Sequence, residues 1–549
     1  MRSYSRTILG GQAGSLVVLS YLQFMQGLGS TLVGNLTGLG ISAINAPPST
    51  LDELRSFLAQ FNLASLLKVV GEVAGEHERG QRYLLGVEVH AHALAYVALV
   101  AIEASSDTLT DVPSRAAVAK ALITFYGLRE PLLDEVETRS DAALEHAIRS
   151  GYAQLRGESD LKHILARAWL IYGAAWSRSP KATPFDIAAA IHTTAGVTLE
   201  QLMVLGYAYS GRARKGGYVE PYSADALAQL PVAISETEQA QFLERSCATY
   251  EEIRVAAASF PVPSRDYEKY RLSPFFVKPL VRADVLPAQA PPDALLAPAP
   301  AYLARRVTEG VYHSLSKAYQ GERADTLFRA AFGYAFQEYV GMLLEACSPP
   351  GTVLAEWEYK SAGKKRHTPD WLLLDGDRLV VIEAKQSVMD LNAKVLGHLD
   401  IVAEGLKKTL IKGADQLLTF RADVLQHIEG LERLKNVREI ELLIVSYDDI
   451  PFANWIIRDL MAREVPNAAD VHICSIDDFE EIQRYYWGRS LFDALRAKRE
   501  GNHQDRAWGL RHWVQERAVL AVSRHPLLTS TFDALIKGWT EPTQPETIT

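Results

Sequence analysis

Nine prolines lie within residues 261–301 and divide the 549-residue chain into two parts of different character. Proline fixes the backbone φ angle and removes an amide donor, so a stretch this rich in proline ends helices and favours extended connectors. A chain of this length also exceeds what one hydrophobic core usually holds, which predicts two or three domains. We therefore expect a domain boundary in this ordered proline-rich bridge, with a short strand over residues 275–281.

Residues 51–260, before the bridge, carry repeated start signals of helices. In a capping box, a hydroxyl side chain and an acid or amide three residues later satisfy free amides of the first helical turn. Apolar residues at spacings of three and four follow these boxes, without convincing β-alternation. This part is predicted to be an all-α domain and a candidate surface for a protein partner or a second copy of the chain. The four boxes begin at Thr50, Thr183, Thr198 and Ser235.

The first 50 residues are nearly uncharged, since no charged side chain occurs from Thr7 to Leu51. Polar side chains interrupt the apolar stretch and glycines follow it, so no run of about 20 strongly apolar residues is available to span a bilayer. We expect residues 1–50 to form a buried helical or oligomerising segment, rather than a membrane helix or a cleaved signal. Membrane association is the alternative.

Composition limits the cellular setting more than the function. Three cysteines lie far apart with no CxxC pair, which excludes a disulfide framework, argues against a structural zinc site and predicts a cytoplasmic protein. The net charge of −9 gives no global electrostatic case for nucleic-acid binding. It does not exclude a nuclease, because metal-binding carboxylates add negative charge and a basic groove would be local.

The part after the bridge, residues 302–488, alternates helix and strand signals. β-Branched and apolar runs bounded by turns predict strands, and a longer segment before them predicts a helix. The order is αβββαβ followed by a further helix and strand, and residues 489–549 are predicted to be a helical tail. The predicted elements are a helix over 325–346 and strands over 353–360, 367–374, 379–386, 439–446 and 471–474, with a hairpin turn over 361–366.

One strand–turn–strand segment carries the residues best suited to chemistry. Glu383 and Lys385 are two apart on a predicted strand, so they project from the same face. The turn over residues 375–377 makes this strand the antiparallel partner of the one that carries Asp370, so the two carboxylates can converge at a sheet edge. Carboxylate oxygens are ligands that Mg²⁺ or Mn²⁺ prefers, and Lys385 beside them could position water or stabilise a phosphoryl transition state.

Pro369–Asp370 and Glu383–Ala384–Lys385, on consecutive strands of an αβββαβ core, resemble the motif of the PD-(D/E)xK superfamily, also called restriction-endonuclease-like. The resemblance covers roughly residues 302–487. It implies metal-dependent hydrolysis of phosphodiester bonds, usually of DNA, with Mg²⁺ or Mn²⁺ as the cofactor. Members often add an acid from the preceding helix, which implies Glu338 as a further metal ligand. Many also add a glutamine or lysine from the helix after the third strand, which implies Gln416 as a catalytic residue.

The predicted turn before Asp370 is basic, with Lys364, Lys365 and Arg366 in succession. Cations at the lip of a metal site would meet phosphates by charge and hydrogen bonding without reading the base sequence. These three residues are therefore predicted to bind nucleic acid. A solvated hairpin tip is the alternative.

The sequence as a whole predicts a two-part protein in which a helical domain accompanies a metal-dependent nuclease that acts on DNA. Bacterial antiviral defence or restriction is the setting suggested by fold-level analogy. Two alternatives stay open. One is a nucleic-acid-binding or scaffold protein with a silent nuclease fold. The other places the main function in the helical part, as a partner-binding or ribonuclease module that uses Arg139 and His146.

Overall fold

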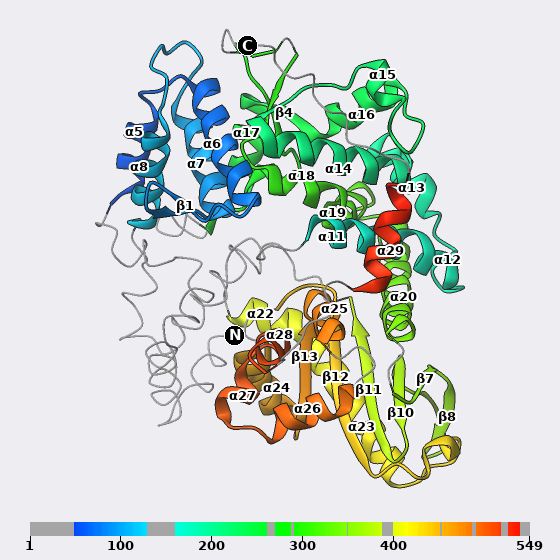
Figure 1. The fold of residues 1–549 in the computed structure, drawn as a ribbon. Coiled ribbons are helices and arrows are strands. Elements are labelled where there is room, and N and C mark those ends of the chain that lie inside the picture. Colours follow the sequence, from blue (N-terminus) through cyan, green and yellow to red (C-terminus); the bar gives the residue numbers. More distant parts are fainter. Residues whose placement is uncertain are drawn as a thin grey trace.

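The chain forms a multidomain α/β structure in which a helical part lies above a part built on a β-sheet (Figure 1). The predicted segment over residues 1–50 lies outside the described residues except for its last two, and so do Arg139 and His146. Within the described ranges, no helix combines the length and apolarity needed to cross a membrane. This computed structural model describes residues 49–128, 160–260, 270–286, 290–291, 293–347, 350–386, 399–450, 453–485, 490–517 and 525–537.

Predicted caps account for where several helices of the helical part begin. Three of the four predicted capping boxes are complete, before α5 (Leu51–Leu58), α14 (Leu199–Gly216) and α16 (Glu236–Ser246). The box predicted at Thr183 is wrong, because α13 (Ile187–Ala195) begins after Asp186, whose carboxylate accepts from the amide of Ala189. The other helices are α6 (Leu63–Glu78), α7 (Ala91–Ala104), α8 (Arg115–Tyr126), α11 (Leu161–Trp169), the π-helix η1 (Leu170–Ala175), α12 (Trp176–Arg178), α15 (Ala224–Leu227), α17 (Tyr250–Ser259), α18 (Pro300–Val307) and α19 (Glu309–Ala318).

The prediction of an all-α N-terminal domain is wrong, because two small sheets lie within the helical part. Their strands are two or three residues long, too short for alternation to show in the sequence. One sheet is a hairpin of β1 and β2, and the other has four strands in the order β3-β6-β5-β4. The strands are β1 (Tyr83–Leu84), β2 (Val87–Glu88), β3 (Tyr218–Val219), β4 (Cys247–Thr249), β5 (Leu280–Arg282) and β6 (Leu295–Leu296).

The described portion of the proline-rich bridge belongs to the helical part. It supplies β5 and β6, which pair with β4 and β3 from the preceding chain. The strand expected over 275–281 is displaced, because Pro274–Phe276 form the 3₁₀ helix η3. Beyond the bridge, Val307 of α18 still packs against Gly206 of α14. The change to the sheet-based part therefore comes later than predicted, at the long helix α20 (Arg323–Ala346).

The sheet-based part contains a five-stranded mixed sheet in the order β13-β12-β11-β10-β7. β7, β10 and β11 run antiparallel, whereas β11, β12 and β13 are parallel. Helices cover both faces: Ile382 shares a core with α20, and Val381 shares one with α23. The elements are β7 (Thr352–Ala355), β10 (Trp371–Asp375), β11 (Arg378–Lys385), α22 (Leu399–Leu406), the π-helix η4 (Lys407–Ile411), α23 (Lys412–Leu425), η5 (Glu432–Leu434), β12 (Glu439–Ser446), η6 (Ala453–Ile457), α24 (Arg458–Glu464), η7 (Ala468–Asp470), β13 (Val471–Ser475) and α25 (Ile476–Tyr485).

A small hairpin interrupts this sheet and corrects the predicted strand bounds. The strand expected over 353–360 is split between β7 and β8 (Glu358–Ser361), and the turn expected over 361–366 is mostly occupied by β8 and β9 (Lys364–His367), which pair as a separate two-stranded sheet. Ala362 and Gly363 make the tight turn at its tip, both with positive φ. The split leaves residues 356–357 and 368–370 at the ends of sheet strands, where side chains can gather.

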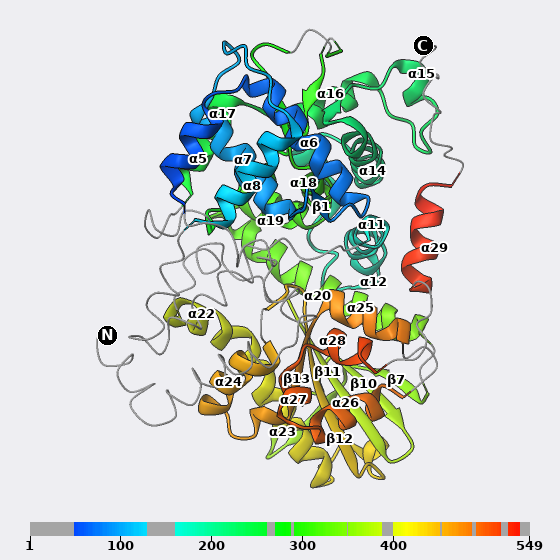
Figure 2. The same ribbon diagram turned by 60° about the vertical axis from the view of Figure 1, so that its left-hand side comes forward.

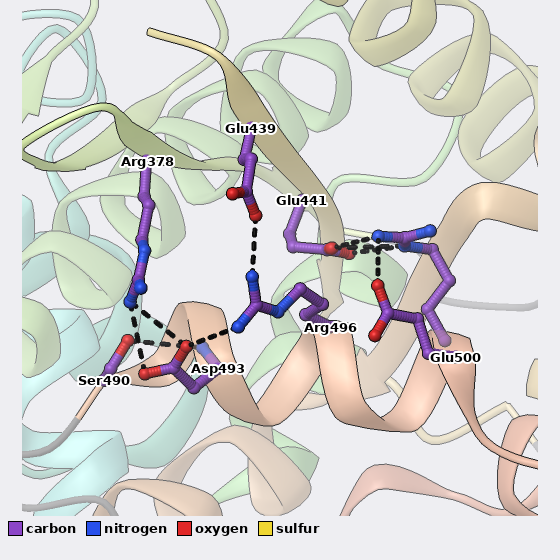
Figure 3. A network of polar contacts seen from close by, with 8 residues as sticks. Arg378, Glu439, Glu441, Ser490, Asp493, Arg496 and Glu500 are labelled. Carbon is purple, nitrogen blue, oxygen red and sulfur yellow. Dashed lines mark hydrogen bonds and ion pairs between the residues drawn. The ribbon is translucent and has the colours of Figure 1, made fainter.

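The predicted C-terminal tail is helical where it is described, but it packs on both parts of the molecule. An ion-pair network joins α26 to the starts of β11 and β12, with Arg378 against Asp493 and Arg496 against Glu439 (Figure 3). The last helix, shown in red, returns to the helical part beside α11, where Phe532 contacts Tyr207 (Figure 2). The tail helices are α26 (Leu491–Glu500), α27 (His503–Ala507), α28 (Leu510–Gln515) and α29 (Pro526–Leu535).

Candidate active site

Asp370 and Glu383 are brought together by the register of two antiparallel strands. Trp371 at the start of β10 pairs with Ile382 of β11, so the next residue outward on each strand is Asp370 and Glu383. Directly opposite residues of an antiparallel pair hold their Cβ atoms about 4.5–5.5 Å apart on the same face. The Ala384 amide donates a hydrogen bond of 2.8 Å to Asp370 Oδ2, which fixes this carboxylate against β11.

Lys385 and Gln416 complete a line of polar contacts from β11 to α23. Lys385 Nζ lies 2.5 Å from Glu383 Oε1 and donates a further hydrogen bond of 3.0 Å to Gln416 Oε1. The lysine side chain passes α23 at Gly413. A Cβ built on Gly413 would lie 3.0 Å from Lys385 Cε, so the glycine leaves room for the lysine. Four of the residues predicted to be catalytic therefore lie within one network.

The surroundings of Asp370 disfavour the ionised form of its carboxyl group. Burial raises the pKa of its carboxyl well above the usual range, and the neighbouring charge of Glu383 raises it further. The hydrogen bond from Ala384 and the charge of Lys385 lower that pKa, but they do not offset the first two effects. Two carboxylates crowded in this way favour either a shared proton or a bound cation.

The sequence did not point to a further acid beside this pair, Glu356. β7 ends at Ala355, which pairs with Trp371, so Glu356 and Asp370 leave the sheet side by side. The charge of Glu356 also raises the pKa of Asp370. A correct prediction of where β7 ends would have identified Glu356. The predicted strand instead continued to residue 360.

Glu356 in turn lies between two basic side chains. His367 Nδ1 is 3.2 Å from its Oε1, and Lys181 Nζ is 3.1 Å from its Oε2. Lys181 belongs to the helical part, between α12 and α13. No local pattern could have placed it here, because its position depends on how the two parts of the chain pack.

Glu338 lies on α20, on the helix that covers the opposite face of the sheet from α23. Burial raises the pKa of its carboxyl, and the charges that act on it are those of Arg178, Glu345 and Lys181. Its electrostatic environment therefore includes Lys181, which also pairs with Glu356. Its role as a metal ligand stays a prediction.

The three basic residues predicted to bind nucleic acid lie on β9. Lys365 Nζ is 3.0 Å from Glu358 Oε1, and Arg366 Nη1 is 3.1 Å from Asp423 Oδ2. Asp423 is seven residues beyond Gln416 on α23, which is about 10 Å along the helix. Lys364 is exposed near the hairpin tip. Two of the three charges are thus engaged within the protein, at a distance from the carboxylate pair.

The donor set fits a hard divalent cation, although it is small. Asp370 and Glu383 offer carboxylate oxygens, and water or main-chain carbonyls would have to supply the remaining ligands that Mg²⁺ or Mn²⁺ requires. Among the described residues, no group of three or more histidine, cysteine or acidic side chains is arranged to hold a metal ion. The raised pKa of Asp370 is the observation that favours a cation here, since a positive charge would relieve the repulsion between the two carboxylates.

Comparisons with known proteins supply no family for this chain. No family model matches it, and searches of curated proteins and of solved structures find no match.

Proposed function

We propose that the chain is a metal-dependent nuclease of the PD-(D/E)xK type that hydrolyses phosphodiester bonds of DNA. The observation that carries the proposal is the placement of Asp370, Glu383 and Lys385 at the adjoining ends of β10 and β11. The strand order αβββαβ of the sheet-based part supports it, because the motif occupies the same two strands as in that superfamily.

The chemistry follows from the charges in this network. A divalent cation, when bound by Asp370 and Glu383, supplies charge neutralisation at a phosphate and activates water for attack. Lys385 is tethered by Glu383 and Gln416, so its ammonium can hold a phosphate oxygen or orient the attacking water without moving far. Gln416 keeps the lysine directed along β11, and Ala384 keeps Asp370 in place through its amide.

A silent nuclease fold is the main rival, and the crowding at Asp370 is the argument against it. A buried carboxylate beside another one destabilises the folded chain unless a ligand compensates for it. A protein that used this fold only as a scaffold would gain stability by losing one of the two acids. Both acids and Lys385 are present.

The test is cleavage by the purified full chain with Mg²⁺, Mn²⁺ or EDTA, on plasmid, linear and single-stranded DNA and on RNA. We expect DNA cleavage with either metal, none with EDTA, and none from Asp370→Ala or Glu383→Ala. Asp375→Asn is the matched control, because Asp375 lies at the other end of the same strand β10. Cleavage that persists in both alanine variants would refute the site, and absence of cleavage of any substrate by the wild type would favour the silent fold.

A further inference from the structure

Lys181 brings a positive charge from the helical part to the edge of the candidate active site. Its Nζ is 3.1 Å from Glu356 Oε2, and Glu356 adjoins Asp370 at the ends of β7 and β10. The hydrogen bond with Glu356 raises the pKa of Lys181, and the charge of Asp370 adds to that shift. The lysine is therefore a fixed cation within electrostatic reach of the carboxylate pair.

The loop that carries Lys181 is held firmly. Ala182 is fully buried, and its amide donates to the carbonyl of Ser179. Trp176 Nε1 donates a hydrogen bond of 3.2 Å to the carbonyl of Phe185, whose ring packs 5.4 Å from that of Phe328 on α20. Because both ends of the loop are anchored to the helix that adjoins the sheet, the position of Lys181 relative to the site is set by the fold.

Lys181 nevertheless faces solvent. Its side chain is 53% exposed, and it lies 5.1 Å from the ring centroid of Tyr334, which is itself 37% exposed. An ion pair this exposed contributes little to stability, typically below about 1 kcal/mol. Stability therefore does not account for a cation and an aromatic ring side by side at this edge, whereas both are groups that contact nucleic acid.

The distribution of charges around the site also favours a contact between Lys181 and nucleic acid. Asp370, Glu383 and Glu356 together repel a polyanion, and a divalent cation between the first two leaves Lys181 and His367 as the basic side chains beside Glu356. Lys385 is paired with Glu383 and only 19% exposed, and Arg366 is paired with Asp423 and 38% exposed. Lys181 is paired with Glu356 and 53% exposed, and unlike His367 beside the same carboxylate it carries a permanent positive charge at neutral pH.

We propose that Lys181 binds a phosphate of the DNA backbone next to the scissile bond, so that the helical part completes the substrate-binding surface of the nuclease. This inference rests on the proposed function. It assigns the helical part a role in substrate binding, and it moves the phosphate contact from the β9 cations to Lys181 beside Glu356.

The test is the salt dependence of DNA binding. The probe is a fluorescently labelled DNA duplex, and the parent is the full-length Glu383→Gln chain, which we expect to bind DNA without cutting it. In that background, Lys181→Ala should weaken binding about tenfold and lower the slope of log affinity against log salt by about one, as expected for one lost phosphate contact. Lys181→Arg should restore most of both, because it keeps the charge.

Lys120→Ala is the matched control. Lys120 is also an exposed lysine of the helical part over an aromatic ring, 4.4 Å from the centroid of Phe57. It should leave affinity and slope unchanged. Equal affinity and slope for Lys181→Ala and the parent would overturn the inference while leaving the nuclease intact. A parent that binds no DNA, in a chain whose wild type cuts none, would overturn the proposed function and the inference with it.

Discussion

At the scale of residues, the crowded carboxyl group of Asp370 lowers the stability of the folded chain. Asp370 is crowded by Glu383 and lies next to Glu356, and burial alone already raises the pKa of its carboxyl. The pKa of an aspartate in the unfolded chain is about 4. A carboxyl whose pKa is higher in the folded chain stabilises the fold at acid pH, and that contribution is lost as pH rises through the folded-state pKa. Because the folded chain holds this proton more tightly than the unfolded chain does, stability falls as pH rises above about 4.

Asp370→Asn should accordingly stabilise the metal-free protein. Asparagine cannot ionise, and its carbonyl can still accept from the Ala384 amide. We expect a gain of about 0.5–2 kcal/mol in the free energy of unfolding at neutral pH in EDTA, which narrows as the pH falls toward about 4. Urea unfolding at several pH values measures it. A variant that is less stable than the wild type at neutral pH would show that the carboxylate is not under strain.

A second residue, Lys498 on α26, makes the free energy of unfolding depend on pH between neutral and alkaline values. Its side chain is fully buried, its Nζ donates 2.8 Å to the carbonyl of Arg506, and burial lowers its pKa to about 7. Between about pH 7 and about pH 10 the unfolded chain binds the extra proton, so stability rises with pH. Below about 7 this contribution is lost.

Lys498→Met should remove that dependence. The difference in unfolding free energy between the two proteins should change by up to about 1.4 kcal/mol per pH unit across this window, with the wild type gaining as pH rises. Urea midpoints of both proteins over the window measure it. Parallel curves would mean that Lys498 keeps an ordinary pKa.

Residue-level reasoning from sequence reached the centre of this site but not its edge. Strand alternation and one tight turn were enough to predict that Asp370, Glu383 and Lys385 converge. Glu356 was missed because the end of β7 was not predicted. The position of Lys181 beside the site could not be predicted, because nothing in the residues around it distinguishes it from a solvated surface lysine.

At the scale of elements, close packing of α20 on the sheet holds β10 where the site needs it. Gly341 faces the indole of Trp371, the residue after Asp370, and a Cβ there would lie 2.0 Å from Trp371 Cζ2. The indole cannot easily move, because its Nε1 donates 2.8 Å to the carbonyl of Gln337. The start of β10 is thus set by a helix that precedes it in the chain.

Gly341→Ala should destabilise the protein by about 1–3 kcal/mol, because the methyl group overpacks this contact. Gly405→Ala is the control, since a Cβ there meets nothing within 4 Å in helix α22, and alanine favours a helix over glycine. Thermal unfolding of both variants compares them. Equal melting temperatures would contradict a tight helix–sheet contact at this point.

Element prediction succeeded where elements were long and failed where they were short. The long strands β11 and β12 are buried on both faces and were predicted nearly at their observed bounds. The strands of the helical part are two or three residues long, β8 divides the strand predicted over 353–360, and β9 lies mostly in the predicted turn over 361–366. Short pairings of this kind are specified by tertiary contacts rather than by local pattern.

At the scale of the whole molecule, one buried ionic cluster joins the two parts. Arg167 on α11 donates to Glu480 and Asp477 on α25, with the Nε–Oε1 bond to Glu480 at 2.7 Å. Tyr339 of α20 donates to the same Glu480 at 2.6 Å. One hydrophobic core contains side chains of both parts, among them Leu165 of α11 and Ile382 of β11. The helical part and the sheet should therefore unfold together.

Arg167→Ala should lower the free energy of unfolding by about 3–5 kcal/mol, because it leaves Glu480 buried without its partner charge. Adding Glu480→Gln to that variant should recover part of the loss, since the unpaired charge is then gone. Urea unfolding followed by both tryptophan fluorescence and circular dichroism measures both effects. Two separate transitions in the wild type would contradict a single cooperative unit.

Mn²⁺ titration by isothermal calorimetry measures whether Asp370 and Glu383 hold one hard cation between them. We predict saturable Mn²⁺ binding to the wild-type chain and to Asp375→Asn, with binding abolished in both Asp370→Asn and Glu383→Gln. Binding that is unchanged in both of those variants, or no Mn²⁺ binding by the wild type, would show that these two carboxylates do not form a metal site.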